Sequence, residues 1–219
     1  MSEFIVYGIP GSPFGRAVLI ALEEKGARYR FQAVAPGTLR LPEHLALHPF
    51  GRVPVLRHGD FRLYETAAIL RYLERVLPTP ALIPAEARAA ARVDQLLNIN
   101  DWYLFQGPGN VIGFQRIVGP RLLGLAPDEA AIEAVLPKAH AVLAEISALL
   151  GSQRFLAGES FTLADAMIAP QLDFLAQTPE WAPLTAQRAN LRDWLARVSA
   201  RPSLASTTWE KVTQLAQAA

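Results

Sequence analysis

A serine stands where an apolar strand pattern gives way to a helix pattern, and its hydroxyl could do chemistry there. Ser12 follows the apolar residues 4–7 and a glycine-rich turn, and it precedes Pro13. Serine followed by proline is a common N-cap and first residue of a helix, so capping alone would explain Ser12. The same position lies beside free amides at the positive end of the helix dipole, where an anion is favoured. A thiol of pKa near 8.5 is only about 3% ionised at pH 7, and such a position would favour its thiolate. The residue type and its position fit both interpretations.

Two residue pairs further along could hold the rest of a peptide ligand. Pro54 begins a predicted strand, which is typical of an edge strand. If its bond to Val53 is cis, the amide and carbonyl of Val53 face outward. Glu65 and Thr66 open a predicted helix, where an acid complements the dipole. Alternatively, the carboxylate, the hydroxyl and the free amides could hold the head of an amino acid.

Other candidate sites are weaker. Arg40 and Arg52 could pair with ligand carboxylates, although an arginine in a loop is more often solvated. His44 and His48 are four residues apart, but no acidic third ligand accompanies them, so we expect no metal site. The turn at residues 8–15 reads GIPGSPFG, which lacks both the dinucleotide glycine pattern and a Walker lysine.

The amino-acid composition excludes several classes of protein and several kinds of site. The chain has no cysteine, which excludes disulfides, thiolate metal sites and a cysteine nucleophile. Lys and Arg number 21 against 20 Asp and Glu, so charge gives no reason to expect nucleic-acid or membrane binding. No stretch approaches the roughly 18 apolar residues of a membrane span, and the N-terminus does not look like a signal peptide. We therefore expect a cytoplasmic protein.

The elements that must position these residues fall into two groups. The first eighty residues alternate between strand and helix patterns in the order βαβαββα. Strands are expected at 4–7, 29–34, 53–57 and 61–63, and helices at 12–26, 42–47 and 65–77. The segment PTPALIP at 78–84 holds three prolines and cannot continue a helix. Beyond it only helix patterns remain, with an interruption at Gly107-Pro108-Gly109 and a capping box from Thr162 to Asp165.

Four segments, in order, resemble the cytosolic glutathione transferases. They are PGSPFGR at 10–16, PEHLALHPFGRVPVL at 42–56, GD at 59–60 followed by LYETAAILRYL at 63–73, and FTLAD at 161–165. The resemblance runs from about residue 4 to residue 203 and is to serine-type, theta/phi-like bacterial members. It implies an α/β thioredoxin-like N-terminal domain at 1–80 that binds glutathione. An all-α C-terminal domain at 85–219 would form the electrophile pocket and part of a homodimer interface.

The resemblance also implies roles for individual residues. Ser12 matches the serine that hydrogen-bonds the glutathione sulfur, and Tyr7 is the rival activator used by tyrosine-type members. The glutathione-binding positions are Arg40, Arg52, Val53, the cis-proline Pro54, Glu65 and Thr66. Asp165 matches a structural capping residue, and His48 replaces the usual asparagine. The pocket for an apolar electrophile is expected at Ile9, Phe14, Trp102, Tyr103, Gln106, Asn110 and Phe114, although aromatic side chains at helical spacing are more often core.

These features predict a glutathione transferase that attacks a hydrophobic electrophile with the glutathione thiolate, as in detoxification. Glutathione is the co-substrate, and no metal is expected. The same site could serve a glutathione-dependent peroxidase, dehalogenase, isomerase or ether-cleaving enzyme. A non-catalytic glutathione-binding or ligand-binding protein is the alternative from another class. The sequence leaves the reaction and the electrophile open.

Overall fold

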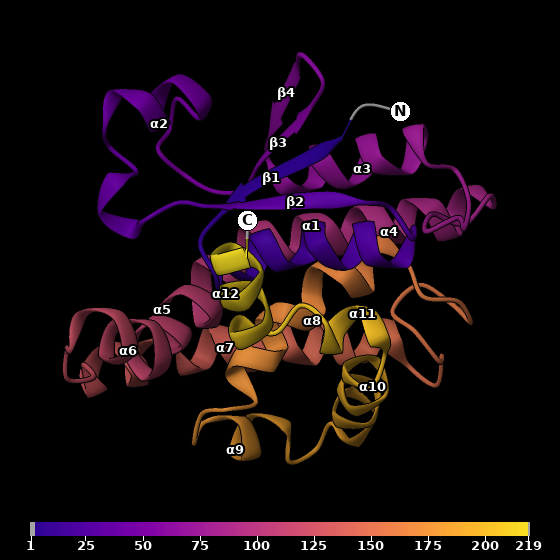
Figure 1. The fold of residues 1–219 in the computed structure, drawn as a ribbon. Helices are drawn as coiled ribbons and strands as arrows, with labels where there is room; N and C mark the ends of the chain where they lie inside the picture. Colours follow the sequence, from indigo (N-terminus) through magenta and orange to yellow (C-terminus); the bar gives the residue numbers. More distant parts are fainter. Residues whose placement is uncertain (1–2, 219) are drawn as a thin grey trace. The chain divides into compact units, whose positions relative to one another are not determined.

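The structure is a computed structural model that describes residues 3–218. The chain forms two compact units (Figure 1). One comprises the residues up to Ala81 together with those from Ala200 onward, and the other is Leu82–Ser199. The sequence assigns 85–219 to a single helical domain. In the structure the segment from Ala200 belongs to the first unit instead, because it packs on a helix and a strand of that unit.

The first unit is built on a four-stranded sheet with the strand order β2-β1-β3-β4. β1 pairs in parallel with β2 and antiparallel with β3, and β4 is antiparallel to β3. The elements, in chain order, are β1 (Phe4–Gly8), α1 (Pro13–Glu24), β2 (Tyr29–Ala33), the 3₁₀ turn η1 (Pro36–Thr38), α2 (Pro42–Leu47), β3 (Val55–His58), β4 (Phe61–Tyr64), α3 (Thr66–Val76), α11 (Pro202–Ala205) and α12 (Trp209–Ala218). The thioredoxin-like fold class expected from the sequence is confirmed.

The core of this unit lies between the sheet and the helices α1 and α3, which pack on each other. Val6 of β1, Val18 of α1 and Ile69 of α3 are fully buried there. β3 begins at Val55, two residues later than the sequence predicts. A proline has no N–H to donate to a strand ladder, so pairing starts after Pro54.

The second unit is all helical. Its elements are α4 (Ala87–Ile99), the π-helical η2 (Asn100–Gly109), α5 (Asn110–Gly113), the π-helical η3 (Phe114–Val118), α6 (Gly119–Leu123), α7 (Glu129–Leu150), α8 (Leu163–Leu175), α9 (Trp181–Thr185) and α10 (Ala189–Ser199). α8 lies at the centre of this unit, because every one of its residues except Asp173 is buried. The predicted interruption is present as a non-helical conformation at Gly107. α7 continues through Pro137.

Two polar clusters organise the second unit. The carboxylate of Asp165 in the first turn of α8 is fully buried and accepts hydrogen bonds from the amide and hydroxyl of Thr162, the amide of Leu156 and the indole of Trp194. Burial raises the pKa of Asp165, and the four donors act against that shift.

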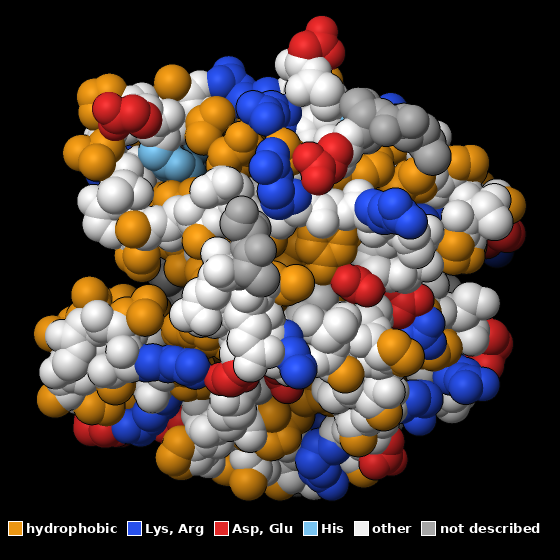
Figure 2. Space-filling view, viewed as in Figure 1, with side chains coloured by type: hydrophobic (Ala, Val, Ile, Leu, Met, Phe, Trp, Pro, Cys, Tyr) orange, Lys and Arg blue, Asp and Glu red, His pale blue; other side chains and the backbone are white. Residues whose placement is uncertain are grey.

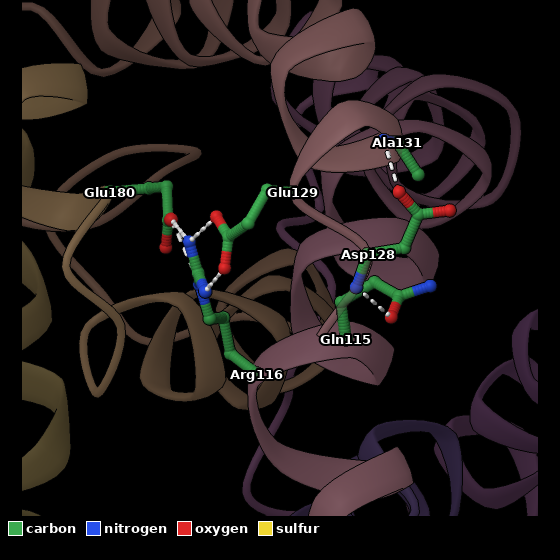
Figure 3. Close-up of polar contacts among 6 residues, drawn as sticks. All are labelled: Gln115, Arg116, Asp128, Glu129, Ala131 and Glu180. Atoms are coloured by element: carbon green, nitrogen blue, oxygen red, sulfur yellow. Dashed lines mark hydrogen bonds and ion pairs between the residues drawn. The ribbon is translucent and has the colours of Figure 1, made fainter. Parts of the chain in front are cut away.

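The second cluster centres on Arg116 of η3 (Figure 3). Its guanidinium group donates to both oxygens of Glu129, at 2.5 and 2.8 Å, and to Oε1 of Glu180, at 2.5 and 2.9 Å. Beside it, the side chain of Gln115 accepts from the amide of Asp128, the N-cap of α7. The cluster therefore ties η3 to the starts of α7 and α9.

The surface carries charges of both signs. On the face drawn in Figure 2, basic and acidic side chains are interspersed. No helix within residues 3–218 has the length and apolar character needed to cross a membrane.

Candidate active site

The strand register brings three loops to one edge of the sheet. Tyr7 lies opposite Val55, and Val55 lies opposite Tyr64. β1 runs toward this edge and leads into the turn that carries Ser12. β4 also ends here and leads into Glu65, and β3 starts here, directly after Pro54. The topology thus collects the predicted site residues of the first unit from three separate parts of the chain.

Ser12 is the N-cap of the twelve-residue helix α1. Its backbone is extended, with φ −65° and ψ 119°, and its Oγ accepts a 3.2 Å hydrogen bond from the amide of Gly15. That bond uses an acceptor site of the hydroxyl and leaves its proton to be donated. The side chain is half-buried. The hydroxyl therefore stands at the positive end of a three-turn helix, where an anion is favoured.

The loop before β3 carries Arg52, Val53 and Pro54. The Val53–Pro54 peptide bond is cis. Behind this loop, Nε2 of the buried His44 on α2 donates a 2.8 Å hydrogen bond to the carbonyl of Arg52. In the sequence, His44 stands out only as one of two histidines four residues apart, a spacing that alone gives weak support for a metal site. Helical spacing cannot indicate this bond, because the bond depends on how the loop folds back over α2.

The start of α3 carries an unusual backbone. Glu65 is the only non-glycine residue with positive φ among residues 3–218, at φ 70° and ψ 113°. An L side chain rarely adopts such a conformation, and strained residues of this kind cluster at ligand sites. The Glu65 side chain is exposed, while the next residue, Thr66, is 6% exposed.

Charges from the loop and from α3 act on a shared neighbour, His48. Burial lowers the pKa of His48, the negative charge of Glu65 acts to raise it, and His44 and Arg52 act to lower it further. The His48 ring stacks on Tyr64 with centroids 4.7 Å apart. Arg52 and Glu65 therefore lie near enough to the same ring for their opposite charges to act on it.

The remaining candidates lie as follows. Arg40 is exposed, and its side chain packs over Gly51, which has positive φ. The rival activator Tyr7 is half-buried in β1.

The predicted electrophile residues Ile9 and Phe14 are half-buried in the first unit. In the second unit Trp102 and Tyr103 are 65% and 66% exposed, Gln106 and Asn110 are exposed, and Phe114 is half-buried. Within residues 3–218, no group of three or more metal-ligating side chains could hold a metal ion.

Comparison with known proteins identifies the family of this chain. Residues 2–75 match the glutathione S-transferase N-terminal domain family, and residues 129–197 match the glutathione S-transferase C-terminal domain family. The chain is 34% identical to glutathione S-transferase 3 of Zea mays over 211 residues, covering 94% of each chain. It is 31% identical to glutathione S-transferase F12 of Arabidopsis thaliana, covering 96% of this chain and 97% of the relative.

A solved structure is similar over the whole chain. Glutathione S-transferase-I bound with the ligand lactoylglutathione has a TM-score of 0.81 and 29% identity, and the match covers 99% of both chains. The fold and site define a two-unit protein with a thioredoxin-like sheet and a helical unit. The chain belongs to the glutathione S-transferase family, with plant F-type homologues among its relatives.

Proposed function

We propose that this glutathione transferase is a serine-type, theta/phi-like enzyme. In it, the Ser12 hydroxyl stabilises the glutathione thiolate, which then attacks an apolar electrophile. The observation that carries the proposal is the position of Ser12. Its hydroxyl accepts one hydrogen bond from the Gly15 amide and keeps its proton to donate, at the N-terminus of α1. A hydrogen bond to the charged form of a group lowers the pKa of that group.

Glutathione would lie along the sheet edge. The backbone of Val53 would pair with the cysteinyl residue, and Glu65 and Thr66 would hold the γ-glutamyl ammonium and carboxylate groups. The strained backbone of Glu65 and the burial of Thr66 support this assignment. Arg40 or Arg52 would pair with the glycine carboxylate. γ-Glutamylcysteine lacks that glycine, so replacing each arginine with Gln distinguishes the two. The partner of the glycine carboxylate is the arginine whose replacement abolishes the preference for glutathione over γ-glutamylcysteine.

The proposed reaction has two steps. The thiol of bound glutathione loses its proton to solvent, and the thiolate accepts a hydrogen bond from Ser12. The sulfur then forms a bond to an electrophilic carbon, and the leaving group departs with its bonding electron pair. The protein supplies a low thiol pKa and proximity. In the second unit, the exposed aromatic residues Trp102 and Tyr103, with Gln106, Asn110 and Phe114, would bind the electrophile.

We further propose a cytoplasmic homodimer. Before α3, three large apolar side chains of the described residues are more than two-fifths exposed: Leu41 at 49%, Phe50 at 60% and Phe61 at 45%. A subunit interface would remove this apolar surface from water. Light scattering coupled to size exclusion tests the assembly, and a monomer at micromolar concentration would contradict it.

One experiment separates the enzyme from a binding protein. Calorimetry should detect glutathione binding, and the same preparation should conjugate glutathione to a generic aryl halide. Binding without turnover of a panel of aryl halides, epoxides and peroxides would favour a non-catalytic role. Absence of glutathione binding at millimolar concentration would contradict the whole proposal.

A further inference from the structure

The C-terminal segment, from Ala200 onward, is hydrogen-bonded to both ends of α1, the helix that Ser12 caps. α11 packs on α1, and α12 packs on β2, so the segment lies with the first unit (Figure 1). In the first turn of α1, Arg16 donates to the carbonyl of Leu204 at 3.1 Å. At the last residue of the helix, Glu24 accepts from Arg201 at 2.7 and 2.8 Å and from Ser203. Both ends of α1 are thereby joined to a segment about 180 residues away in sequence.

Within the same segment, Trp209 contacts Gly11, the residue directly before Ser12. Gly11 has φ +87°, and a Cβ added there would lie 2.3–2.6 Å from three indole carbons of Trp209, which is closer than a real Cβ approaches any neighbour. The indole is therefore packed directly against the backbone of the residue before Ser12. Only a glycine permits this approach, both for its backbone angle and for its missing side chain.

Trp209 is itself held in place. It is the first residue of α12 and is half-buried. The hydroxyl of Thr213 donates to its carbonyl at 2.8 Å, and Val212 on the same helix is 3% exposed. These contacts hold the start of α12, from which the indole reaches the backbone of Gly11.

We propose that Trp209 is a positioning residue that sets where the Ser12 hydroxyl stands. This inference rests on the proposed role of Ser12. Hydrogen bonds weaken steeply with distance and angle, so a small shift of the Gly11–Ser12 turn weakens the bond to the thiolate. The residues proposed to bind the rest of glutathione lie on other loops, so the shift leaves the ligand's backbone contacts intact.

The test separates thiol ionisation from ligand binding. The pKa of the bound thiol is measured from thiolate absorbance against pH in the wild type, Trp209→Ala, Trp209→Phe and Ser12→Ala. Binding is measured with S-methylglutathione, which has no ionisable thiol. Leu215→Ala, at an exposed position of α12, serves as the control for changes to that helix.

We expect Trp209→Ala to raise the pKa of the bound thiol by about 0.5–1 and to change the Kd for S-methylglutathione less than about threefold. Trp209→Phe keeps an aromatic ring and should give a smaller rise, and Leu215→Ala should give none. If Trp209→Ala does not fold, Trp209→Phe decides. An unchanged pKa in the folded variant overturns the inference.

The two proposals fail in different ways. If Ser12→Ala leaves the thiol pKa unchanged, the proposed function fails, whatever Trp209 does. If Ser12→Ala raises the pKa and the folded Trp209 variants do not, only the positioning role is wrong. A loss of S-methylglutathione binding in the Trp209 variants would also contradict it, since the residue would then act on binding instead of on the serine.

Discussion

The indole of Trp194 donates a 2.8 Å hydrogen bond to Oδ1 of Asp165, and this bond ties α10 to the first turn of α8. Both side chains are fully buried. The same carboxylate accepts from the amides of Leu156 and Thr162, so one side chain satisfies donors from three segments of the second unit. Its loss would leave several buried donors without a partner.

We therefore expect Asp165→Ala to destabilise the protein by about 3 kcal/mol or more, since each unsatisfied buried donor costs about 1–3 kcal/mol. Denaturant unfolding followed by tryptophan fluorescence measures the change. Asp193→Asn, at an exposed position of α10, is the control and should shift the midpoint little. A midpoint for Asp165→Ala equal to that of the control would refute the structural role.

Thr66 provides a test of the γ-glutamyl site. Thr66→Val keeps the size of this buried side chain and removes its hydroxyl. If the hydroxyl bonds the γ-glutamyl carboxylate, the Kd for glutathione should rise about tenfold, which corresponds to about 1.4 kcal/mol for a hydrogen bond to a charged group. Thr66→Ser retains the hydroxyl and should bind nearly as the wild type does. Equal calorimetric Kd values for the Val and Ser variants would exclude this assignment.

The Arg116 cluster predicts a pH dependence of stability. Hydrogen bonds from Arg116 lower the pKa of Glu129 below its ordinary value of 4.5. For Glu180, burial is the largest effect and acts to raise the pKa, but the hydrogen bonds from Arg116, the backbone and Thr178 together with the charge of Arg116 outweigh it, and the pKa is lowered. Because both folded-state values are depressed, the stabilisation is complete above about pH 4.5 and is lost as pH falls through the lowered values.

Arg116→Gln should therefore be less stable than the wild type at neutral pH, and the difference should shrink as pH falls below about 4.5. Thermal unfolding between pH 3 and 7 measures it. Arg75→Gln, at an exposed position of α3, controls for the loss of a positive charge. A stability difference that stays constant over this range would show that the ion pairs are not its source.

Much of the first unit could be predicted from the sequence, because its signals are local. The apolar run before Gly8, the Ser12-Pro13 pair and the hairpin around Gly59 each fix a strand or helix end by short-range chemistry. The capping box from Thr162 to Asp165 is local in the same way. The order of these elements then determines the fold class, since strand–helix alternation is typical of an α/β unit.

What the sequence could not provide were the long-range contacts. The attachment of the segment from Ala200 to the first unit depends on Arg16 and Glu24 meeting residues about 180 positions later. The bond from His44 to the Arg52 carbonyl depends on a loop path that no periodicity describes. The positive φ of Glu65 is also invisible in the sequence, because a glutamate favours other backbone angles.

We propose above all that the Ser12 hydroxyl lowers the pKa of the glutathione thiol. A pH titration of the bound thiol in the wild type, Ser12→Ala and Tyr7→Phe tests this proposal most directly. For the wild type we expect a pKa below about 7, well under the value of about 8.5 for a free thiol. Ser12→Ala should raise it by about 1–2, as expected for loss of a hydrogen bond to a charged group, while Tyr7→Phe leaves it in place. An unchanged pKa in folded, glutathione-binding Ser12→Ala would contradict the account, and a rise in Tyr7→Phe instead would assign the activation to the tyrosine.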